Sequence, residues 1–498
     1  MNLEEYIAKI IKEESDKLIL RYHAYHNVLH LEHLRNEKRI VSAPPKKVMK
    51  PDYWVQDKKF NPFYVNKRSK SIARSIAKKI SEQTYKPHSP YIKEIPKASG
   101  GIRRVAIYQI PDAAISRIYY DRLLAKNKHR FSSFSYAYRN DRNVHFAIQD
   151  ISLDISRDAR SFIAEFDFSD FFGSISHEYL RAQFDSNGFF ISNEERYVIN
   201  SFLKDRDVGI PQGTSISLFL ANLVCWQLDL RIERAGLKFA RYADDTVVWS
   251  PDYQKICDAF TIINEFSSSA GIQINAKKSD GISLLTKEGL PTELKSTKTN
   301  IEFLGYSISV DSVSIKEASV RKIKKQISYL LYRNLIQPLK GSMLKGLIIP
   351  SGGKDPALLT ALMQIRRYMY GGLTDQQLRN YLSGCTKRIY FKGIMSFYPL
   401  VNDEGQLRSL DGWIVSVIYR SLRLRVKLLK KWGYDRSTVF PFNVRCFEIP
   451  VAFKANKVHG KPLLEVPSFM LIQRAIKKGL KNRGIENVMN PESIDYDY

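Results

Sequence analysis

Three aspartates stand where a sequence that only built a core would not place them. Asp167 lies near the end of an apolar and aromatic run, and Asp244 and Asp245 stand together between two β-prone runs. Each segment taken alone fits a capping or turn aspartate, which is common. Together the three carboxylates can bind two divalent cations about 3.5–4 Å apart, the arrangement on which nucleotidyl transfer depends. In a strongly basic chain, such a cluster of acids is costly unless metal neutralises it.

The segments around these acids predict a sheet with helices packed against it. Residues 162–168 read as a mostly buried strand, and the runs 239–241 and 246–249 read as a hairpin with the acid pair at its turn. Helix 214–234 has apolar residues on nearly every face, which suits a helix buried under a sheet. Later elements are a helix that ends at Gly271, a short strand at 272–274 and a β run at 303–310. This order predicts an α+β, palm-like sheet.

The charge of the chain points to a polyanionic partner. The 498 residues include 78 Lys and Arg against 51 Asp and Glu, a net charge of +27, and residues 311–498 contribute +18 of it. Such broad positive potential favours nucleic acid. The four cysteines form no CxxC pair, which argues against a zinc knuckle or a disulfide framework. Without an apolar run of about 18 residues or a secretory leader, we expect a cytoplasmic protein with no membrane partner.

Tyr242-Ala243-Asp244-Asp245 resembles the YxDD box of reverse transcriptases, and other segments resemble that family in the same order along the chain. These segments are Ile95-Pro96-Lys97 with Gly100-Gly101-Ile102-Arg103 (basic fingers hairpin), 166–172 (first palm motif), 211–215 (Gln-Gly box), 271–278 (lysine motif) and 303–306 (primer-grip hairpin). The resemblance implies an α+β right-hand polymerase fold. Its expected parts are a helical N-terminal extension and the start of the fingers at 1–90, fingers and palm at 91–310, and a basic, mainly helical thumb and C-terminal extension at 311–498.

The resemblance also implies catalytic roles. Asp167 and Asp244 would bridge two Mg²⁺ ions, with Mn²⁺ as the alternative ion, and Asp245 would be a weaker or outer ligand. Carboxylates suit Mg²⁺. Lys278 would donate charge or a proton to the leaving pyrophosphate, but Lys277 beside it leaves the register open, and a solvated lysine is the alternative.

A further set of residues would bind the incoming nucleotide: Lys97, Arg103, Arg104, Phe172, Gln212 and Gly213. Lys97 and Arg103 would clamp the triphosphate, with Arg104 as the competing candidate for the second role. Gln212 and Gly213 would pass beneath the nucleotide, where a residue without Cβ lets the backbone approach closely. The ring of Phe172 would clash with a ribose 2′-hydroxyl, which favours dNTPs.

Residues 410–414 and the basic residues after them resemble, more loosely, the thumb of group II intron maturases. The apolar face of this predicted helix, which includes Trp413, Ile414, Ile418 and Leu422, would pack inward. Its basic residues would contact backbone phosphates: Arg423, Arg425, Lys427, Lys430 and Lys431. A basic helix that is merely solvated is the alternative.

Departures from the family pattern narrow the expected function. The sequence has no Val-Thr-Gly triplet in the thumb region and no recognisable Cys/His nuclease, integrase or RNase H segment. It most resembles the antiphage defence-associated and abortive-infection reverse transcriptases. We therefore expect an RNA-directed DNA polymerase that uses dNTPs to copy a structured, non-coding partner RNA into DNA, and a homo-oligomer is compatible with the sequence. The alternatives are an inactive, polymerase-like RNA-binding scaffold and an RNA-dependent RNA polymerase; the intact site residues argue against the first and Phe172 against the second.

The chain ends in a short acidic tail that contains Tyr496 and Tyr498. A tyrosine hydroxyl can act as a nucleophile, so these two residues are candidate protein primers. A solubilising tail whose tyrosines do nothing is the alternative.

Overall fold

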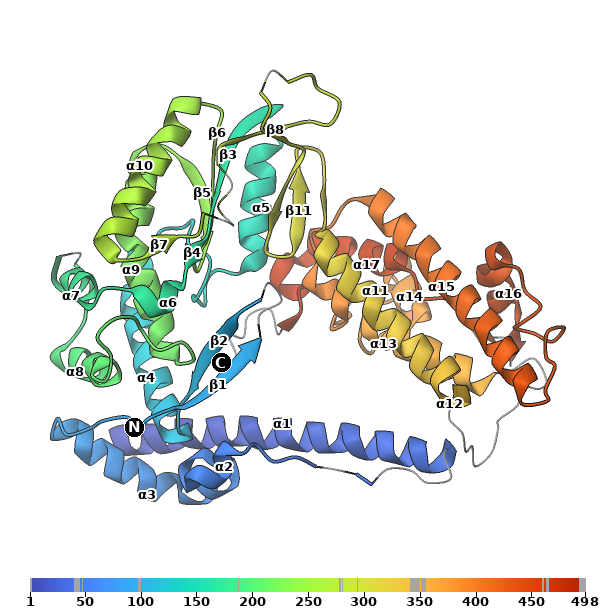
Figure 1. Ribbon diagram of the computed structural model, residues 1–498, viewed down its shortest axis with the longest axis horizontal. Coiled ribbons are helices and arrows are strands. Elements are labelled where there is room, and N and C mark those ends of the chain that lie inside the picture. The colour runs from blue at the N-terminus through green and yellow to red at the C-terminus, as the bar shows by residue number, and fades with distance from the viewer. Residues whose placement is uncertain are drawn as a thin grey trace.

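The strand-rich half of the chain and the helical C-terminal third lie on opposite sides of the β1–β2 hairpin in the computed structural model (Figure 1). Helix α1 (Leu3–Arg39) runs beneath both parts. The structure describes residues 2–39, 45–46, 48–96, 100–186, 188–276, 279, 281–292, 294–340, 350, 355–458, 461–462 and 465–491. The fold is α+β, as predicted, with a mainly helical C-terminal region.

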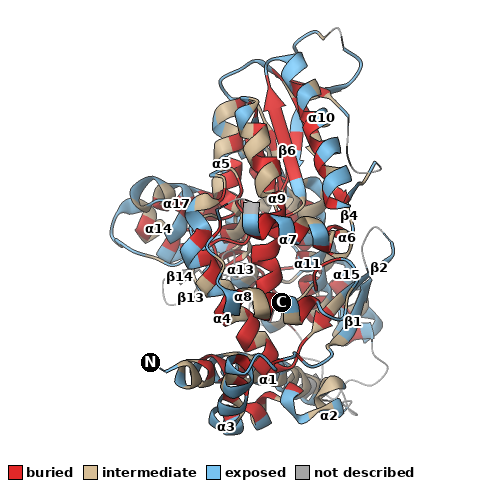
Figure 2. Ribbon diagram, turned by 90° about the vertical axis from the view of Figure 1, so that its left-hand side faces the viewer, coloured by how far each residue is buried: buried red, intermediate tan, exposed pale blue. Residues whose placement is uncertain are grey.

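Five strands form the central sheet in the order β5-β6-β3-β8-β9. Their bounds are β3 Arg160–Phe166, β5 Lys238–Tyr242, β6 Asp245–Ser250, β8 Ser283–Thr286 and β9 Thr297–Lys298. Phe239 and Val248 share a core with helices α9 (Ser215–Arg234) and α10 (Tyr253–Ala270), while Val247 and Trp249 share the other core with α5 (Val144–Ile155). A sheet buried on both faces needs consecutive apolar residues, and β6 is buried from Thr246 to Ser250 (Figure 2).

Helix α9 follows the prediction of a helix beneath the sheet. It is long and apolar enough to cross a membrane by length and composition, but 72% of its apolar stretch is buried inside the fold. Packing inside the fold therefore accounts for the apolar residues of α9.

Two predicted strands differ from the observed ones. The run 162–168 is divided at Asp167, because β4 (Phe168–Ser169) leaves the central sheet and pairs with β7 (Gln273–Ile274). The run 303–310 is a hairpin of β10 (Asn300–Phe303) and β11 (Tyr306–Ser309). In both places the chain changes direction within an apolar run, which hydrophobic pattern alone does not reveal.

The fingers hairpin has the predicted form. Strands β1 (Tyr91–Pro96) and β2 (Ile102–Ile107) pair antiparallel, with Pro96 opposite Ile102 beside the glycine turn. Around it and in the N-terminal region lie α2 (Tyr53–Gln56), η1 (Lys58–Phe60), α3 (Pro62–Ser81), α4 (Ile110–Asn127), η2 (Lys128–Arg130), α6 (Phe171–Ser174), α7 (His177–Ser186) and α8 (Asn193–Leu203). The Ser176 hydroxyl accepts a hydrogen bond from the backbone N–H of Tyr179 and caps α7.

A three-stranded sheet, β10-β11-β12, leads into the helical C-terminal region. The elements that follow are β12 (Val313–Ile315), α11 (Glu317–Leu331), the π-helical η3 (Tyr332–Ile336), α12 (Gln337–Lys340), α13 (Pro356–Tyr370), α14 (Asp375–Ser383), η4 (Ile394–Phe397), α15 (Glu404–Lys431), η5 (Cys446–Glu448), α16 (Ile449–Ala455), β13 (Lys457–Val458), β14 (Lys461–Pro462), α17 (Phe469–Arg483) and η6 (Ile485–Asn487). In α15, Ile414, Ile418 and Leu422 are buried as predicted, whereas Trp413 is half-buried. An ion pair of 2.8 Å between Glu32 in α1 and Arg333 in η3 joins the N-terminal helix to the helical C-terminal region.

Candidate active site

Strand register brings the three aspartates to one end of the central sheet. β3 and β6 pair antiparallel with Phe166 opposite Thr246, so Asp167 and Asp245 are the next residues of the two strands. Asp244 precedes Asp245 in the two-residue turn that connects β5 to β6. Asp245 is thus the first residue of β6 rather than a turn residue, a small correction to the predicted hairpin. The fold makes neighbours of acids that are far apart in the sequence.

Asp167 is oriented by a residue to which the sequence analysis gave no role. The side-chain amide of Asn275 donates a hydrogen bond to Oδ2 of Asp167 at 2.8 Å, and its backbone N–H donates to the Asp167 carbonyl at 2.8 Å. The backbone N–H of Asp167 donates to the Ser279 hydroxyl at 3.1 Å. Asn275 lies inside the segment that resembles the lysine motif, and that position was the available signal. The segment therefore also fixes Asp167.

The donor set fits Mg²⁺ in its chemistry. Three carboxylates lie on adjoining strand ends, and carboxylate oxygens are the ligands that Mg²⁺ prefers. Within the described part of the chain, no three His, Cys, Asp or Glu side chains are gathered closely enough to hold a metal ion as they stand. Asp167, Asp244 and Asp245 are the residues that would hold the ions, and the amide of Asn275 supports Asp167 from outside the ligand set.

A cavity of about 480 Å³ lies between the fingers hairpin and the chain that follows Asp167. It is lined by Ile92, Glu94, Arg104, Ala106, Asp170, Phe172, Gly173, Arg206, Ile210 and Gln212. Phe172 is 9% exposed, and its ring meets the Tyr138 ring edge-on with centroids 6.4 Å apart. The cavity has the size of a small-molecule site and brings together three of the predicted nucleotide-binding residues, Arg104, Phe172 and Gln212.

Backbone hydrogen bonds hold the Gln-Gly loop against the fingers hairpin and the chain just before that loop against α6. The N–H of Ala106 donates to the Gln212 carbonyl at 2.8 Å, and the N–H of Ile210 donates to the Phe172 carbonyl at 2.7 Å. Gly213 has φ +118°, and a Cβ built there would lie 2.4 Å from the Ala106 carbonyl oxygen. Only glycine fits this close approach without displacing the backbone. The predicted role of Gly213 therefore has a steric basis.

We expect Gly213→Ala to raise the KM for dNTPs by at least about tenfold, because the displaced loop carries Gln212 out of the cavity wall. Steady-state kinetics and thermal unfolding would measure both the KM and the stability. Gly412→Ala is the matched control, since a Cβ at Gly412 meets nothing within 4 Å. Equal KM values for the two variants would contradict the assignment of this loop to the nucleotide site.

The structure separates the two candidate arginines of the fingers. Arg104 and Ala106 of β2, with their partners Glu94 and Ile92 of β1, line the cavity. Side chains alternate along a strand, so Arg103 lies on the opposite face and does not line it. Arg104 also forms an ion pair of 3.2 Å with Glu94. The competing candidate, Arg104, is thus the arginine at the cavity, and the triphosphate contact of Arg103 stays a prediction.

Arg206 is a second basic residue at the cavity, and the sequence analysis missed it. It follows α8 and lines the cavity. Burial raises the pKa of the adjacent Tyr108 hydroxyl to about 12, although the charge of Arg206 opposes that shift. A single arginine in a polar loop carries no sequence signal for a nucleotide contact. Four predicted site residues, Lys97, Lys278, Tyr496 and Tyr498, lie outside the described residues, as does Lys277.

Four of the five residues of α15 that are predicted to bind phosphates are exposed. Arg423, Lys427, Lys430 and Lys431 are exposed. Arg425 is wrong as a phosphate contact, because it is 4% exposed and its Nε donates to Oδ2 of Asp355 at 2.8 Å. Its Nη1 also donates to the Leu335 carbonyl at 2.9 Å. Asp355 directly precedes α13 and is 70 residues from Arg425 in the sequence. The ion pair with Asp355 holds Arg425 in the core.

We expect replacement of the four exposed basic residues of α15 by glutamine to weaken RNA binding. If each residue contacts a phosphate, the slope of log affinity against log salt concentration falls by about three units. Filter binding across a salt series would measure that slope. Arg408→Gln is the control, since Arg408 is exposed on the same helix and pairs with Glu404 at 2.7 Å. An unchanged slope in the fourfold variant would remove α15 from the RNA-binding surface.

Comparisons with known proteins agree with this site. Residues 95–308 match the family described as "Reverse transcriptase (RNA-dependent DNA polymerase)". The chain is 28% identical over 176 residues to the retron Ec86 reverse transcriptase of Escherichia coli, covering 34% of this chain and 49% of that protein. It is 21% identical over 457 residues to the putative COX1/OXI3 intron 1 protein of Saccharomyces cerevisiae, covering 76% and 51%. The chain therefore spans about half the length of these two relatives.

Among solved structures, the telomerase of Candida albicans with a fragment of telomeric RNA is 15% identical, with a TM-score of 0.35 and coverage of 76% of this chain and 68% of that one. The family match at residues 95–308 includes the end of β1, all of β2, the central sheet and all three aspartates. The fold is the predicted α+β right-hand polymerase fold. Residues 95–308 are therefore similar to a reverse transcriptase domain, and the two relatives that the chain partly matches are a retron enzyme and an intron protein.

Proposed function

We propose that this protein is an RNA-directed DNA polymerase that extends a primer with dNTPs along an RNA template. The proposal rests on the strand register that sets Asp167 beside Asp245 at the sheet end, close in sequence to the cavity wall at Phe172. Bound Mg²⁺ would activate the attacking 3′-hydroxyl and neutralise charge on the triphosphate. Asn275 keeps Asp167 oriented for that task, and Arg104 and Arg206 supply positive charge at the cavity.

The cavity wall supports deoxyribonucleotide selection. The Phe172 ring is buried and meets the Tyr138 ring edge-on, and the Phe172 carbonyl accepts a hydrogen bond from the Ile210 N–H, so the ring does not yield easily to a bulkier sugar. The 2′-hydroxyl of an NTP then meets a fixed apolar surface. A dNTP has no atom at that position.

The finer parts of the proposal concern the template and the biological role. The +18 charge of residues 311–498 and the exposed basic residues of α15 support binding of a structured, non-coding partner RNA. The sequence resemblance to defence-associated enzymes supports a role in bacterial antiphage defence, in the cytoplasm. Phage plaque counts on cells that carry the wild-type protein or its Asp244→Asn variant test the role: equal counts would contradict it.

A primer-extension assay tests the activity itself. The purified full chain is incubated with Mg²⁺, a primed RNA template and labelled dNTPs or NTPs. Incorporation of dNTPs but not NTPs is expected. No incorporation of either would favour the scaffold alternative, and NTP incorporation would favour an RNA polymerase.

Protein priming is tested on a denaturing gel after RNase treatment. If Tyr496 or Tyr498 is the primer, the label stays with the wild-type polypeptide and is lost in the Tyr496→Phe plus Tyr498→Phe variant. Free product from the wild type would contradict protein priming.

A further inference from the structure

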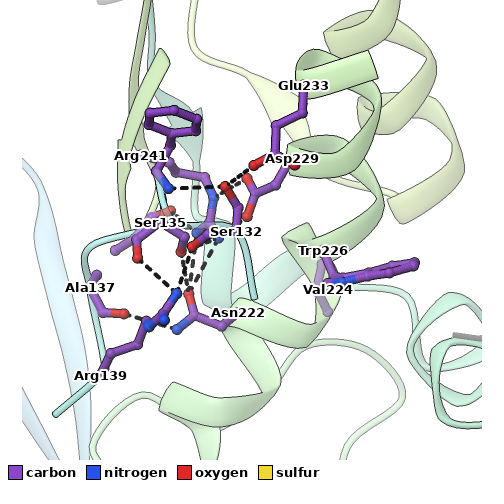
Figure 3. Close-up of polar contacts among 12 residues, drawn as sticks. Ser132, Ser135, Ala137, Arg139, Asn222, Val224, Trp226, Asp229, Glu233 and Arg241 are labelled. Carbon is purple, nitrogen blue, oxygen red and sulfur yellow. Dashed lines mark hydrogen bonds and ion pairs between the residues drawn. The ribbon is translucent and has the colours of Figure 1, made fainter. Parts of the chain in front are cut away.

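Arg241 is a fully buried arginine directly before the Tyr242-Ala243-Asp244-Asp245 segment. Arg241 is 0% exposed. Its partner on α9, Asp229, is 1% exposed. Nε of Arg241 donates to Oδ1 of Asp229 at 2.7 Å, and Nη2 donates to Oδ2 at 2.6 Å (Figure 3). Burial alone would lower the pKa of Arg241, but the carboxylate of Asp229 raises it, so the guanidinium stays charged.

The same guanidinium reaches the turn that carries Asp244. Its Nη1 donates to the Ala243 carbonyl at 3.0 Å, and its Nη2 donates to the Ser135 hydroxyl at 2.7 Å. Ala243 has φ +61°, a conformation that residues with a Cβ rarely adopt. Such a conformation persists where the surroundings hold it. The hydrogen bond from Arg241 is one contact that does so.

Arg241 also ties the turn to two other segments of the palm. Its backbone N–H donates to the Phe134 carbonyl at 3.0 Å, and its carbonyl accepts from the Tyr136 N–H at 2.9 Å. On α9, about two turns before Asp229, Asn222 donates to the Ala137 carbonyl at 2.9 Å. Strand β5, helix α9 and the chain at 134–137 thus meet at one buried charge, as Figure 3 shows.

Stability alone does not account for a buried ion pair here. Desolvation of two charges offsets much of their attraction, so an apolar pair of similar size often stabilises a core as well or better. What an apolar pair cannot do is donate hydrogen bonds in one plane to a carboxylate and a turn carbonyl together, as a guanidinium does. The presence of arginine at this position is therefore better explained by its hydrogen bond to the turn than by stability.

We propose that Arg241, anchored by Asp229, is a positioning residue that holds the Ala243-Asp244 turn in the geometry required for metal binding. This inference rests on the proposed polymerase function for its consequence in catalysis. Arg241 does not touch the substrate or the ions; it acts through the backbone of the turn. Its loss should therefore reduce kcat and metal affinity while leaving the KM for the primed template unchanged.

The thumb contains a matched control. Arg425 is buried like Arg241, donates through Nε and Nη2 to a buried aspartate, Asp355, and donates through Nη1 to a backbone carbonyl, that of Leu335. The two arginines have the same kinds of partners in different parts of the fold. Arg241→Lys and Arg425→Lys both keep a positive charge but cannot reproduce the planar set of donors, so they should cost similar stability.

The experiment compares the two full-length variants with the wild type. Mn²⁺ alone is titrated into each protein and followed by electron paramagnetic resonance, amide hydrogen exchange is measured at residues 242–246, and kcat and KM are measured with Mg²⁺. Relative to Arg425→Lys, Arg241→Lys should weaken Mn²⁺ binding by about 10- to 100-fold, speed exchange at the turn and lower kcat by at least about tenfold.

Equal Mn²⁺ affinity, exchange and kcat in the two variants would overturn the proposal and leave Arg241 a core residue. If Arg241→Lys does not fold, Asp229→Asn is compared with Asp355→Asn by the same measurements, and the same equality overturns the proposal. A wild-type protein that synthesises no DNA overturns the proposed function alone, because turn exchange and Mn²⁺ binding still report on Arg241.

Discussion

Changing Asp244 and Asp245 together to asparagine is expected to reduce DNA synthesis by at least about a thousandfold. Asparagine keeps the size of each side chain but removes the negative charge that binds Mg²⁺. Asp245 is exposed at the start of β6, and Asp244 is half-buried in the two-residue turn before it, so neither residue is part of the hydrophobic core. The free energy of unfolding and the affinity for RNA should therefore stay near those of the wild type. Primer extension, thermal unfolding and RNA binding would measure the three properties.

Asp311→Asn is the matched control for the double variant. Asp311 is an exposed acid between β11 and β12, in a second hairpin, and it pairs with Lys287 at 3.0 Å. Its replacement should leave synthesis unchanged. DNA synthesis retained in Asp244→Asn plus Asp245→Asn would remove these residues from the site, and loss of folding in that variant would show that they stabilise the turn instead.

Phe172→Ala is expected to lower the preference for dNTPs over NTPs by at least about tenfold. Removal of the ring opens the cavity wall where a ribose 2′-hydroxyl would lie, while the other lining residues stay. The ratio of kcat/KM for a dNTP and the matching NTP is the measurement, because it reports differential binding of the two transition states. The gain should appear mainly in NTP incorporation.

The same substitution also removes a buried ring, and its cost of about 3–5 kcal/mol must be separated from the change in selectivity. Phe171→Ala is the control for this purpose. Phe171 is 3% exposed, packs against Phe168 and does not line the cavity. It should lose comparable stability with no change in the dNTP/NTP ratio. An unchanged ratio in Phe172→Ala would withdraw the gate role from Phe172.

Much of the fold was predictable from local pattern. The buried helix α9, the hairpin that carries Asp244 and the fingers hairpin with its glycine turn lie where periodicity and turn residues place them. The strand that was predicted to run through Asp167 is divided instead. Apolar residues continue past the break because β4 is also buried, so hydrophobicity did not mark the change of partner.

The acids were recognised from residue type and spacing because metal binding constrains both. By itself the sequence predicted a kind of chemistry, placed the three aspartates at the ends of β-prone runs, and determined the cationic character of the C-terminal third. Only the tertiary structure decided what Asn275, Arg241 and Arg425 do. Each depends on a partner distant in the chain or on another element, and Arg425 meets Asp355 70 residues away. Whether a charged side chain on a helix or strand is exposed or buried depends on the elements that pack against it, and the local sequence does not specify those elements.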